Sequence, residues 1–490
     1  MTTIATSSQP VVHTHTGPVR GERRTHGTRF LGIPYAQPPV GPLRFAAPVP
    51  PEPWTRLRDA TAYGPTAQRR RLFEVTTIPE PSIPGEGTLN LNVFTPDPAP
   101  DASRPVLVWI HGGGFLAGSA ASPWYDGDAF NRDGVVLVSI GYRLGIEGFL
   151  HLPDAPDNRG VLDWIAALEW VQRNIASFGG DPGQVTIAGQ SAGGGAVQTL
   201  LATPAARGLF RAAISASGAV MRPQDRETAE AVTRRLAEHT GAPVTAAALE
   251  KLSDAELLDL QDAATAPGTP MLALAPFADG LLVPEPVPDA LTTGDAGADI
   301  PLMLGFTAHE FNAAPQPGAT TETLHATFAA LGLDETAVRA FTETYDGGTP
   351  GELQSQALTD VVFRAPGLAV AEARARRARP TWLYEFRLGS TAPGLTGLAH
   401  HCVDLPFAFD LLDAEGVTPA LGDQPPQHVA DAVHAAWTAF VRDLDPGADW
   451  PAYTPERRET RIWDAAPRTE SDPLHRLRAI WGGPEHLTKD

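Results

Sequence analysis

Two runs of consecutive apolar residues give the first indication of how this chain folds. Residues 106–110 (Val-Leu-Val-Trp-Ile) and 135–140 (Val-Val-Leu-Val-Ser-Ile) have the length of strands, and a glycine-containing segment follows each run. A strand that is apolar on both faces must be covered on both faces. The two runs therefore predict a mainly parallel sheet with helices packed on its two sides.

Strand and helix patterns alternate along most of the chain. Apolar residues recur at three- and four-residue spacing over 158–177, which predicts a helix. We expect further strands at 89–94, 185–189, 212–217, 301–306 and 381–386, and helices within 224–265, 318–343, 351–377 and 428–442. No internal repeat or long linker interrupts this order. The sequence therefore predicts one α/β domain over 1–490 rather than two domains.

Three stretches lack such a pattern. Residues 1–17 are polar and without the apolar core of a secretory signal, so we expect a flexible N-terminus. Residues 51–88 read as irregular loops, and the chain beyond residue 442 reads as a proline-rich tail. We expect long loop and helical insertions around the sheet.

Composition narrows the function classes. The formal net charge of −20 disfavours nucleic acid and anionic membranes as partners, because binding phosphates requires clustered cations. No apolar run approaches the ~20 residues that span a bilayer. Cys402 is the single cysteine, which excludes an internal disulfide and a thiolate metal cluster. We expect a soluble cytoplasmic protein without a metal ion or cofactor.

The segment Gly189-Gln190-Ser191-Ala192-Gly193 follows the predicted strand at 185–189 and precedes an apolar, helical run. A serine between a strand and a helix, flanked by small residues, is the pattern of a nucleophile held on a strained turn. Chance can also produce this pattern, because the chain contains 47 glycines. The interpretation therefore depends on finding a base, an acid and an oxyanion site elsewhere.

Polar side chains that follow other strands supply the base and the acid. Glu310 follows the strand at 301–306, and His400 and His401 follow the strand at 381–386. In α/β sheets such groups meet at the carboxyl ends of the strands, and the order Ser, acid, His is that of α/β-hydrolases. The residues alone do not separate the two histidines. Asp279 and Asp404 are lesser candidates for the acid.

The segment His111-Gly112-Gly113-Gly114-Phe115 directly after the strand at 106–110 predicts an oxyanion site. Glycine N–H groups are unobstructed by side chains, and the N–H of Ala192 lies beside the serine. We interpret His111 as an anchor for this loop. Phe115 either packs in the core or lines the acyl pocket.

These motifs together resemble the type-B carboxylesterases, a family with the α/β-hydrolase fold. The resemblance extends over residues 17–465 and is carried by residues 30–36, 89–94, 111–115, 174–182, 189–193, 405–409 and 450–453. It implies Ser191 as nucleophile, His401 rather than His400 as base, Glu310 as acid, Gly113, Gly114 and Ala192 as oxyanion donors, and Ser217 as a supporting serine. It also implies the ion pairs Arg44–Glu86 and Arg143–Asp163.

The sequence departs from the family pattern at three places. Gln190 precedes the nucleophile where the family usually has glutamate, which removes one negative charge near the site and weakens the case for a cationic substrate. Thr88 occupies the place of a usual cysteine. The acid has unusual neighbours, His309 and Phe311, and we expect His309 to lie at the surface.

The resemblance implies a serine hydrolase that cleaves small-molecule carboxylic esters through an acyl-enzyme. Two alternatives stay open: a non-catalytic binding or adhesion protein of the same fold, and an acyl hydrolase of amides, thioesters or lactones.

Overall fold

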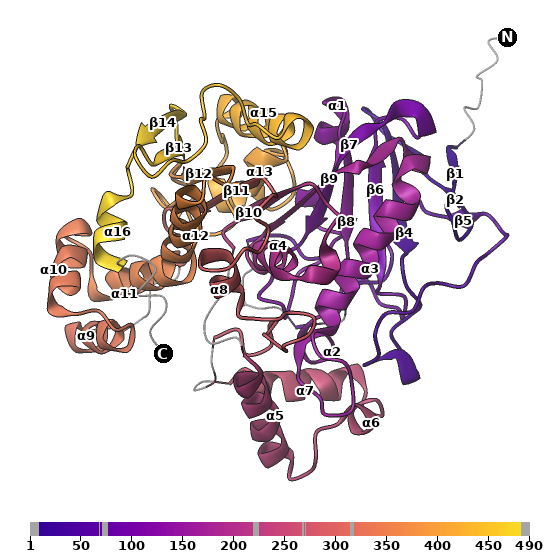
Figure 1. Cartoon of the computed structure of the whole chain (residues 1–490), viewed down its shortest axis with the longest axis horizontal. Coiled ribbons are helices and arrows are strands. Elements are labelled where there is room, and N and C mark those ends of the chain that lie inside the picture. The colour runs from indigo at the N-terminus through magenta and orange to yellow at the C-terminus, as the bar shows by residue number, and fades with distance from the viewer. Residues whose placement is uncertain are drawn as a thin grey trace.

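The computed structural model describes residues 9–67, 69–70, 77–218, 225–266, 269, 271–313 and 318–481. Within them, eleven strands form one large sheet (Figure 1). Their spatial order is β14 (Arg468–Ser471), β13 (Glu459–Trp463), β12 (Thr381–Phe386), β11 (Leu302–Thr307), β10 (Ala212–Ala216), β9 (Gly180–Gln190), β7 (Arg104–Ile110), β8 (Val136–Ile140), β6 (Asn90–Thr95), β4 (Thr28–Pro34) and β3 (Glu22–Arg23).

The centre of this sheet is parallel and its margins are antiparallel. Parallel pairing joins seven neighbouring strands, in the order β8, β7, β9, β10, β11, β12 and β13. The pairs β6–β8, β4–β6, β3–β4 and β13–β14 are antiparallel. The strands that the sequence predicts are all present, so the expectation of a mainly parallel α/β sheet is confirmed.

Helices cover both faces, as the continuous apolar runs require. Along β7, Val106, Val108 and Ile110 belong to one apolar core, and Leu107 and Trp109 belong to the other. Helices α3 (Arg159–Asn174), α4 (Ala192–Ala202) and α12 (Ala365–Arg376) pack in the first core, and α15 (Gln427–Asp443) packs in the second. The alternation of side chains along a strand therefore divides the interior into two layers.

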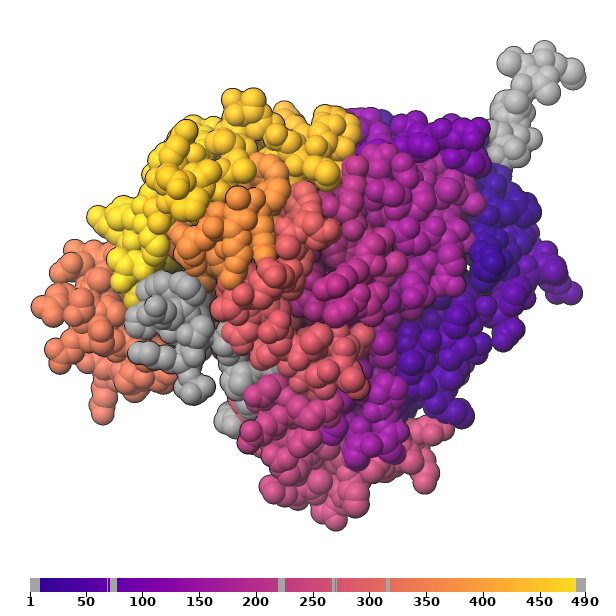
Figure 2. Space-filling model, viewed as in Figure 1, coloured from indigo at the N-terminus to yellow at the C-terminus, as the bar shows by residue number. Residues whose placement is uncertain are grey.

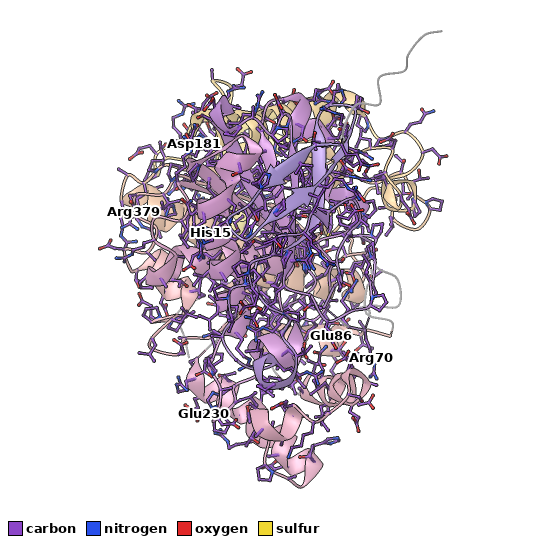
Figure 3. The ribbon with its side chains drawn as sticks, turned by 90° about the vertical axis from the view of Figure 1, so that its right-hand side faces the viewer. His15, Arg70, Glu86, Asp181, Glu230 and Arg379 are labelled. Carbon is purple, nitrogen blue, oxygen red and sulfur yellow. The ribbon has the colours of Figure 1, made fainter. Side chains whose placement is uncertain are left out.

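Two groups of helices extend from the layers. One contains α5 (Arg226–Thr240), α6 (Ala246–Leu249) and α7 (Asp254–Ala264), and forms the lower end of the molecule in Figures 1 and 2. The other contains α9 (Thr321–Ala330), α10 (Glu335–Thr344) and α11 (Pro350–Thr359), with α16 (His475–Trp481) packed on α10. Figure 3 shows Glu230 of α5 on one side of the first group and Arg70 on the other. Arg70 contacts Asp259 and Asp262 of α7.

The remaining elements are short. The helices are α1 (Asp128–Arg132), α2 (Gly145–Phe149), α8 (Val287–Thr292), α13 (Leu405–Ala408), α14 (Val417–Leu421) and a π-helix at Asp360–Arg364. Single 3-10 turns occur at Gly41–Leu43, Pro100–Ala102, Pro123–Tyr125, Ile175–Phe178 and Pro204–Ala206. In the described part of the chain, no helix is both long and apolar enough to cross a membrane.

The two ends of the chain correct the sequence-based expectations. Strands β1 (Val11–His13), β2 (Pro18–Arg20) and β5 (Arg58–Asp59) form a small second sheet, so the prediction of a flexible segment up to residue 17 is wrong for residues 9–17. Residues 1–8 lie outside the described residues. The proline-rich C-terminal region contributes β13, β14 and α16. The two strands give no strand pattern in the sequence because they are only five and four residues long and rich in charged and polar side chains.

Of the two ion pairs that the resemblance implies, one is present. The Arg143 Nε and Nη2 atoms lie 2.8 and 2.7 Å from the carboxylate of Asp163, and both side chains are buried. Arg143 also donates to the backbone oxygens of Arg44 and Ala46. This pair connects the end of β8, helix α3 and the loop at residue 44.

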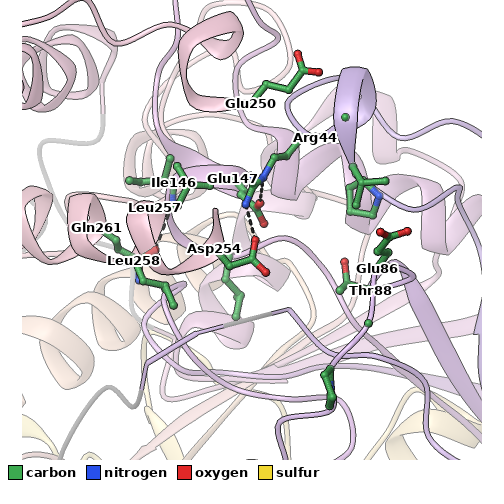
Figure 4. Close-up of a pocket in the computed structure, with 16 residues that line it drawn as sticks. Arg44, Glu86, Thr88, Ile146, Glu147, Glu250, Asp254, Leu257, Leu258 and Gln261 are labelled. Atoms are coloured by element: carbon green, nitrogen blue, oxygen red, sulfur yellow. Dashed lines mark hydrogen bonds and ion pairs between the residues drawn. The ribbon is translucent and has the colours of Figure 1, made fainter. Parts of the chain in front are cut away.

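The pair Arg44–Glu86 is wrong. Arg44 lies 2.6 Å from Glu147 of α2 and 2.6 Å from Asp254 of α7, and Glu86 lies apart from it across a surface pocket (Figure 4). Glu86 is exposed and keeps its hydration, whereas Glu147 is partly buried and requires a cation. Arg44 therefore connects the N-terminal region with the α5–α7 group.

We expect Asp163→Asn to lower the free energy of unfolding by about 3–5 kcal/mol, because it leaves the buried Arg143 guanidinium without its charge partner. Glu169→Gln is the matched control: Glu169 is on the same helix and pairs with Arg173, but both side chains are half-exposed, so its effect should stay below about 1 kcal/mol. Urea denaturation followed by tryptophan fluorescence measures both. Equal midpoints for the two variants would contradict the prediction.

Candidate active site

The turn at Ser191 joins β9 to α4. Ser191 has φ 58° and ψ −123°, a backbone conformation that non-glycine residues rarely adopt. A Cβ atom at Gly189 would overlap the carbonyl of Gly193, and one at Gly193 would overlap the carbonyl of Ile110. Glycine at both positions is therefore what lets the helix start directly against the end of the strand.

Three side chains from different strand ends form a hydrogen-bonded row. His401 Nε2 lies 2.9 Å from Ser191 Oγ, and His401 Nδ1 lies 2.5 Å from Glu310 Oε2. Glu310 follows β11 and His401 follows β12, two strands that pair in parallel. The His401 backbone N–H also donates to the Glu310 carbonyl at 3.0 Å, which holds the two loops together.

The second oxygen of Glu310 is fixed by two donors. Glu310 Oε1 accepts from the Ser217 hydroxyl at 2.6 Å and from the Thr307 N–H at 2.8 Å. Glu310 and Ser217 are both buried, and Ser217 directly follows β10. The carboxylate therefore has a single orientation, with Oε2 free to accept from the imidazole of His401.

The structure separates residues that the sequence left as alternatives. His400 is buried and its Nε2 donates to the Ala420 carbonyl at 3.0 Å. Asp404 accepts from the Tyr384 hydroxyl at 3.1 Å. Asp279 accepts from Asn158 Nδ2 at 2.9 Å and from backbone N–H groups of its own loop. Each has partners elsewhere, so Glu310 is the carboxylate that contacts His401.

Burial and neighbouring charges shift the protonation of this loop. Burial by itself lowers the pKa of His401, but the negative charge of the Glu310 carboxylate beside Nδ1 outweighs it, so the pKa lies well above its ordinary value. Burial raises the pKa of the Cys402 thiol, and it raises the pKa of Asp404 to about 6, with a further contribution from the charge of Glu310. The thiol is therefore protonated at neutral pH.

The glycine loop lies against the serine turn. A Cβ atom at Gly112 would come within 2.6 Å of the Gln190 carbonyl and 3.0 Å of Ser191 Cβ. Gly113 and Gly114 have φ values of 114° and 60°, in the region that favours glycine. Within the described residues, the N–H groups of Gly113, Gly114 and Ala192 donate to no protein acceptor. These three N–H groups of the glycine loop and the serine turn are thus without an acceptor among the described residues.

His111 supports this loop rather than reacting. Its Nδ1 donates to the Gly112 carbonyl at 2.9 Å, its ring stacks on Tyr142 at 4.5 Å, and the Tyr142 hydroxyl donates to the His111 carbonyl. Burial lowers the pKa of His111 to about 4, so the ring is neutral. Phe115 is also buried and packs on Phe149 and Trp164, which places its side chain in the core.

Sequence reasoning missed part of the environment of His401. The rings of Phe363 and Phe311 lie 5.0 and 5.8 Å from the imidazole. Phe363 is on the π-helix, inside a segment that reads only as helical, so its sequence carried no signal. His309 corrects an expectation: it is half-buried, and its Nδ1 accepts from the Ala399 N–H at 3.1 Å because the two loops pack together.

No group of three or more His, Cys, Asp or Glu side chains within the described residues has the arrangement of a metal site. The chemistry that the geometry supports is nucleophilic, with the hydroxyl of Ser191, the imidazole of His401 and the carboxylate of Glu310 in one row.

Comparison with known proteins agrees with this geometry. The model of the carboxylesterase family matches residues 8–474. A para-nitrobenzyl esterase of Bacillus subtilis (strain 168) is 37% identical over 486 residues, covering 94% of this chain and 96% of that protein. Phenmedipham hydrolase of Pseudarthrobacter oxydans is 35% identical over 480 residues, covering 91% and 93%.

Solved structures show the same likeness. A thermophilic para-nitrobenzyl esterase superimposes with a TM-score of 0.86 at 34% identity, over 97% of this chain and all of that one. A carboxylesterase of Geobacillus stearothermophilus gives a TM-score of 0.84 at 36% identity, over 96% and 100%. The chain therefore belongs to the carboxylesterase family and is a carboxylic ester hydrolase with the α/β-hydrolase fold.

Proposed function

We propose that Ser191 is the nucleophile, His401 the general base and Glu310 the acid that orients it. The observation that carries this proposal is the row in which His401 lies 2.9 Å from Ser191 Oγ and 2.5 Å from Glu310. Ser191 Oγ attacks the ester carbonyl while His401 Nε2 takes its proton. Glu310 keeps the Nδ1 proton in place and stabilises the imidazolium.

In the same proposal, the N–H groups of Gly113, Gly114 and Ala192 bind the oxyanion that forms. Donors fixed before the reaction stabilise that charge without a cost of reorganisation. His401 then returns its proton to the leaving alcohol, and water repeats the cycle on the acyl-enzyme with His401 again as base. Ser217 holds Glu310, and Phe115 supports the glycine loop from the core.

We propose a small-molecule carboxylic ester as the substrate. The names of the two relatives, an esterase of a para-nitrobenzyl group and a hydrolase of phenmedipham, support a substrate with an aromatic portion. The rings of Phe311 and Phe363 beside His401 supply an aromatic surface next to the reacting atoms. A set of esters with graded acyl chains and either benzyl or alkyl alcohols tests this preference.

We also propose that the whole chain acts as one catalytic domain, which is supported by the single large sheet whose strands contribute all three residues of the row. A cytoplasmic setting stays a prediction. It is supported by the single cysteine, which leaves the fold independent of disulfides.

Ser191→Ala should reduce kcat for p-nitrophenyl acetate or butyrate by about 10⁴–10⁶-fold, because no other hydroxyl replaces the nucleophile. The variant should keep its circular dichroism spectrum and melting temperature. Ser471→Ala, which changes an exposed serine at the edge strand β14, is the control and should retain full activity. Turnover close to wild type in Ser191→Ala would exclude the mechanism.

Glu310→Gln should lower kcat by about 10³–10⁴-fold, because an amide neither stabilises the imidazolium nor fixes the tautomer of His401. Ser217→Ala removes one of the two donors to Glu310 Oε1 and should lower kcat only about 10-fold. Steady-state kinetics with a p-nitrophenyl ester measures both. The assignment of the acid is wrong if Glu310→Gln retains activity within tenfold of wild type.

The pH dependence follows from the raised pKa of His401. The base must be neutral to accept the proton of Ser191, so kcat/KM falls as the pH drops through this pKa. The acidic limb should therefore lie above about 6.5, the ordinary value for histidine, with about a tenfold loss per pH unit below it. A profile of kcat/KM from pH 5 to 9 measures the limb, and undiminished activity at pH 5 would contradict the prediction.

A further inference from the structure

Gln190, the residue before the nucleophile, contacts His401 directly. Its Nε2 atom lies 3.1 Å from His401 Nε2, the same atom that lies 2.9 Å from Ser191 Oγ. His401 Nδ1 donates to Glu310, so in the neutral imidazole Nε2 carries one lone pair and no proton. Two donors, the amide of Gln190 and the hydroxyl of Ser191, therefore converge on one acceptor.

The other end of this amide has no partner. Gln190 is fully buried, and its Oε1 forms no hydrogen bond with any described residue. That oxygen lies beside the glycine loop, where a Cβ atom at Gly112 would come within 3.0 Å of it. Buried carbonyl oxygens are normally paired, so an unpaired oxygen next to reacting groups calls for an explanation.

The groups that surround His401 differ between the two sides of its ring. Glu310 faces it from the loop after β11, and Cys402, Asp404 and His400 lie on its own loop. The rings of the neighbouring elements are uncharged. Gln190 and Ser191 are thus the polar, uncharged groups that contact the Nε2 side of the imidazole, opposite to the Glu310 carboxylate on the Nδ1 side.

The proton transfer changes His401 Nε2 from a hydrogen-bond acceptor to a hydrogen-bond donor. When the Ser191 Oγ–carbon bond forms, the proton of Oγ moves to His401 Nε2, and the electron pair of the substrate carbonyl moves to its oxygen. Nε2 then bears a proton, which it shares with Oγ and later gives to the leaving alcohol, and the ring carries a positive charge. The amide N–H that suited the imidazole now faces another N–H, whereas a half-turn about the terminal torsion of Gln190 presents Oε1 in its place. This torsion is soft, and the two amide ends have nearly the same shape.

We propose that Gln190 is a positioning residue for His401 whose amide serves Nε2 in both protonation states, through its N–H group in the imidazole and through Oε1 in the imidazolium. The amide takes and gives no proton itself. It holds the ring in the line between Ser191 and Glu310 during acylation and deacylation. This inference rests on the proposed roles of Ser191 and His401 and deepens them.

A glutamate at this position, as the family usually has, behaves differently. An ionised carboxylate accepts hydrogen bonds but donates none, so it can serve the imidazolium only. Its charge also favours the protonated ring. Glutamine adds no charge that favours the protonated ring, and it still has an oxygen that can face the imidazolium.

The test compares Gln190→Met with Gln198→Met. Methionine keeps the length of glutamine and removes both hydrogen-bonding ends. Gln198 is also buried and donates to Ser215 Oγ from α4, away from His401. We expect Gln190→Met to lower kcat for p-nitrophenyl acetate about tenfold or more with KM within about twofold. Gln198→Met should match wild type, and melting temperatures should confirm that both variants are folded.

Gln190→Glu provides the second readout. Labelling of Ser191 by a serine-directed organophosphonate, followed as a function of pH, reports the protonation of His401 without a chosen substrate. We expect the acidic limb of the labelling rate to move upward by about one pH unit or more in Gln190→Glu. The limb should stay unchanged in Gln198→Glu. A role in packing alone would not move this limb.

The outcomes separate this inference from the proposed function. If wild type is neither labelled at Ser191 nor inactivated by Ser191→Ala, the proposed function itself fails. If wild type behaves as a serine esterase but Gln190→Met keeps kcat within twofold, or folded Gln190→Glu keeps the wild-type limb, only the role of Gln190 is overturned. If Gln190→Glu does not fold, the kcat and KM of Gln190→Met decide.

Discussion

The close approach of β9 and α4 at Ser191 is the constraint on which the active site depends. The strand and the helix meet at Gly189 and Gly193, where no side chain separates their backbones. The carbonyl of Ile110 occupies the place that a Cβ atom at Gly193 would take. The Ser191 N–H donates to Ala216 at the end of β10, which fixes the turn to the neighbouring strand. This arrangement directs the hydroxyl out of the sheet edge and places the first N–H of α4 beside it.

Every other part of the site is positioned relative to that turn by the parallel sheet. His401 and Ser191 are 210 residues apart in the chain, and His401 and Glu310 are 91 apart. Strands β9, β10, β11 and β12 are consecutive neighbours, so their carboxyl ends bring Ser191, Ser217, Glu310 and His401 to one edge. The pairing of the strands thus brings these segments together although they are far apart in the sequence. Helix α11 also fixes the loop that carries Glu310, because Thr359 Oγ1 at its end accepts a hydrogen bond from the Phe311 N–H at 3.0 Å.

Polar groups in the interior divide into those that hold the fold and those that hold the reaction. Arg143 and Asp163 form an ion pair, and Arg143 also donates to the backbone at residue 44. Neither side chain takes part in the proposed reaction. Glu310 is also buried, but one of its oxygens contacts His401, whose protonation changes during the proposed reaction. Gln190 is buried with one amide end on His401 and one end unpaired. Such incomplete satisfaction is costly in a core, and its position beside the base is what gives it a chemical use.

The sequence by itself determined the sheet, the serine turn that carries the proposed nucleophile, and the order in which the proposed catalytic groups follow along the chain. Continuous apolar runs are a local property, and the glycines around Ser191 reflect a local steric requirement, so both are visible in the printed chain. The tertiary structure alone decided which histidine contacts Ser191, which carboxylates bind Arg44, and where the amide of Gln190 points. It also revealed β13 and β14, whose short, charged strands are stabilised by pairing at the sheet edge rather than by their own pattern. These features depend on contacts between segments far apart in the chain, and such contacts have no periodicity that a single sequence displays.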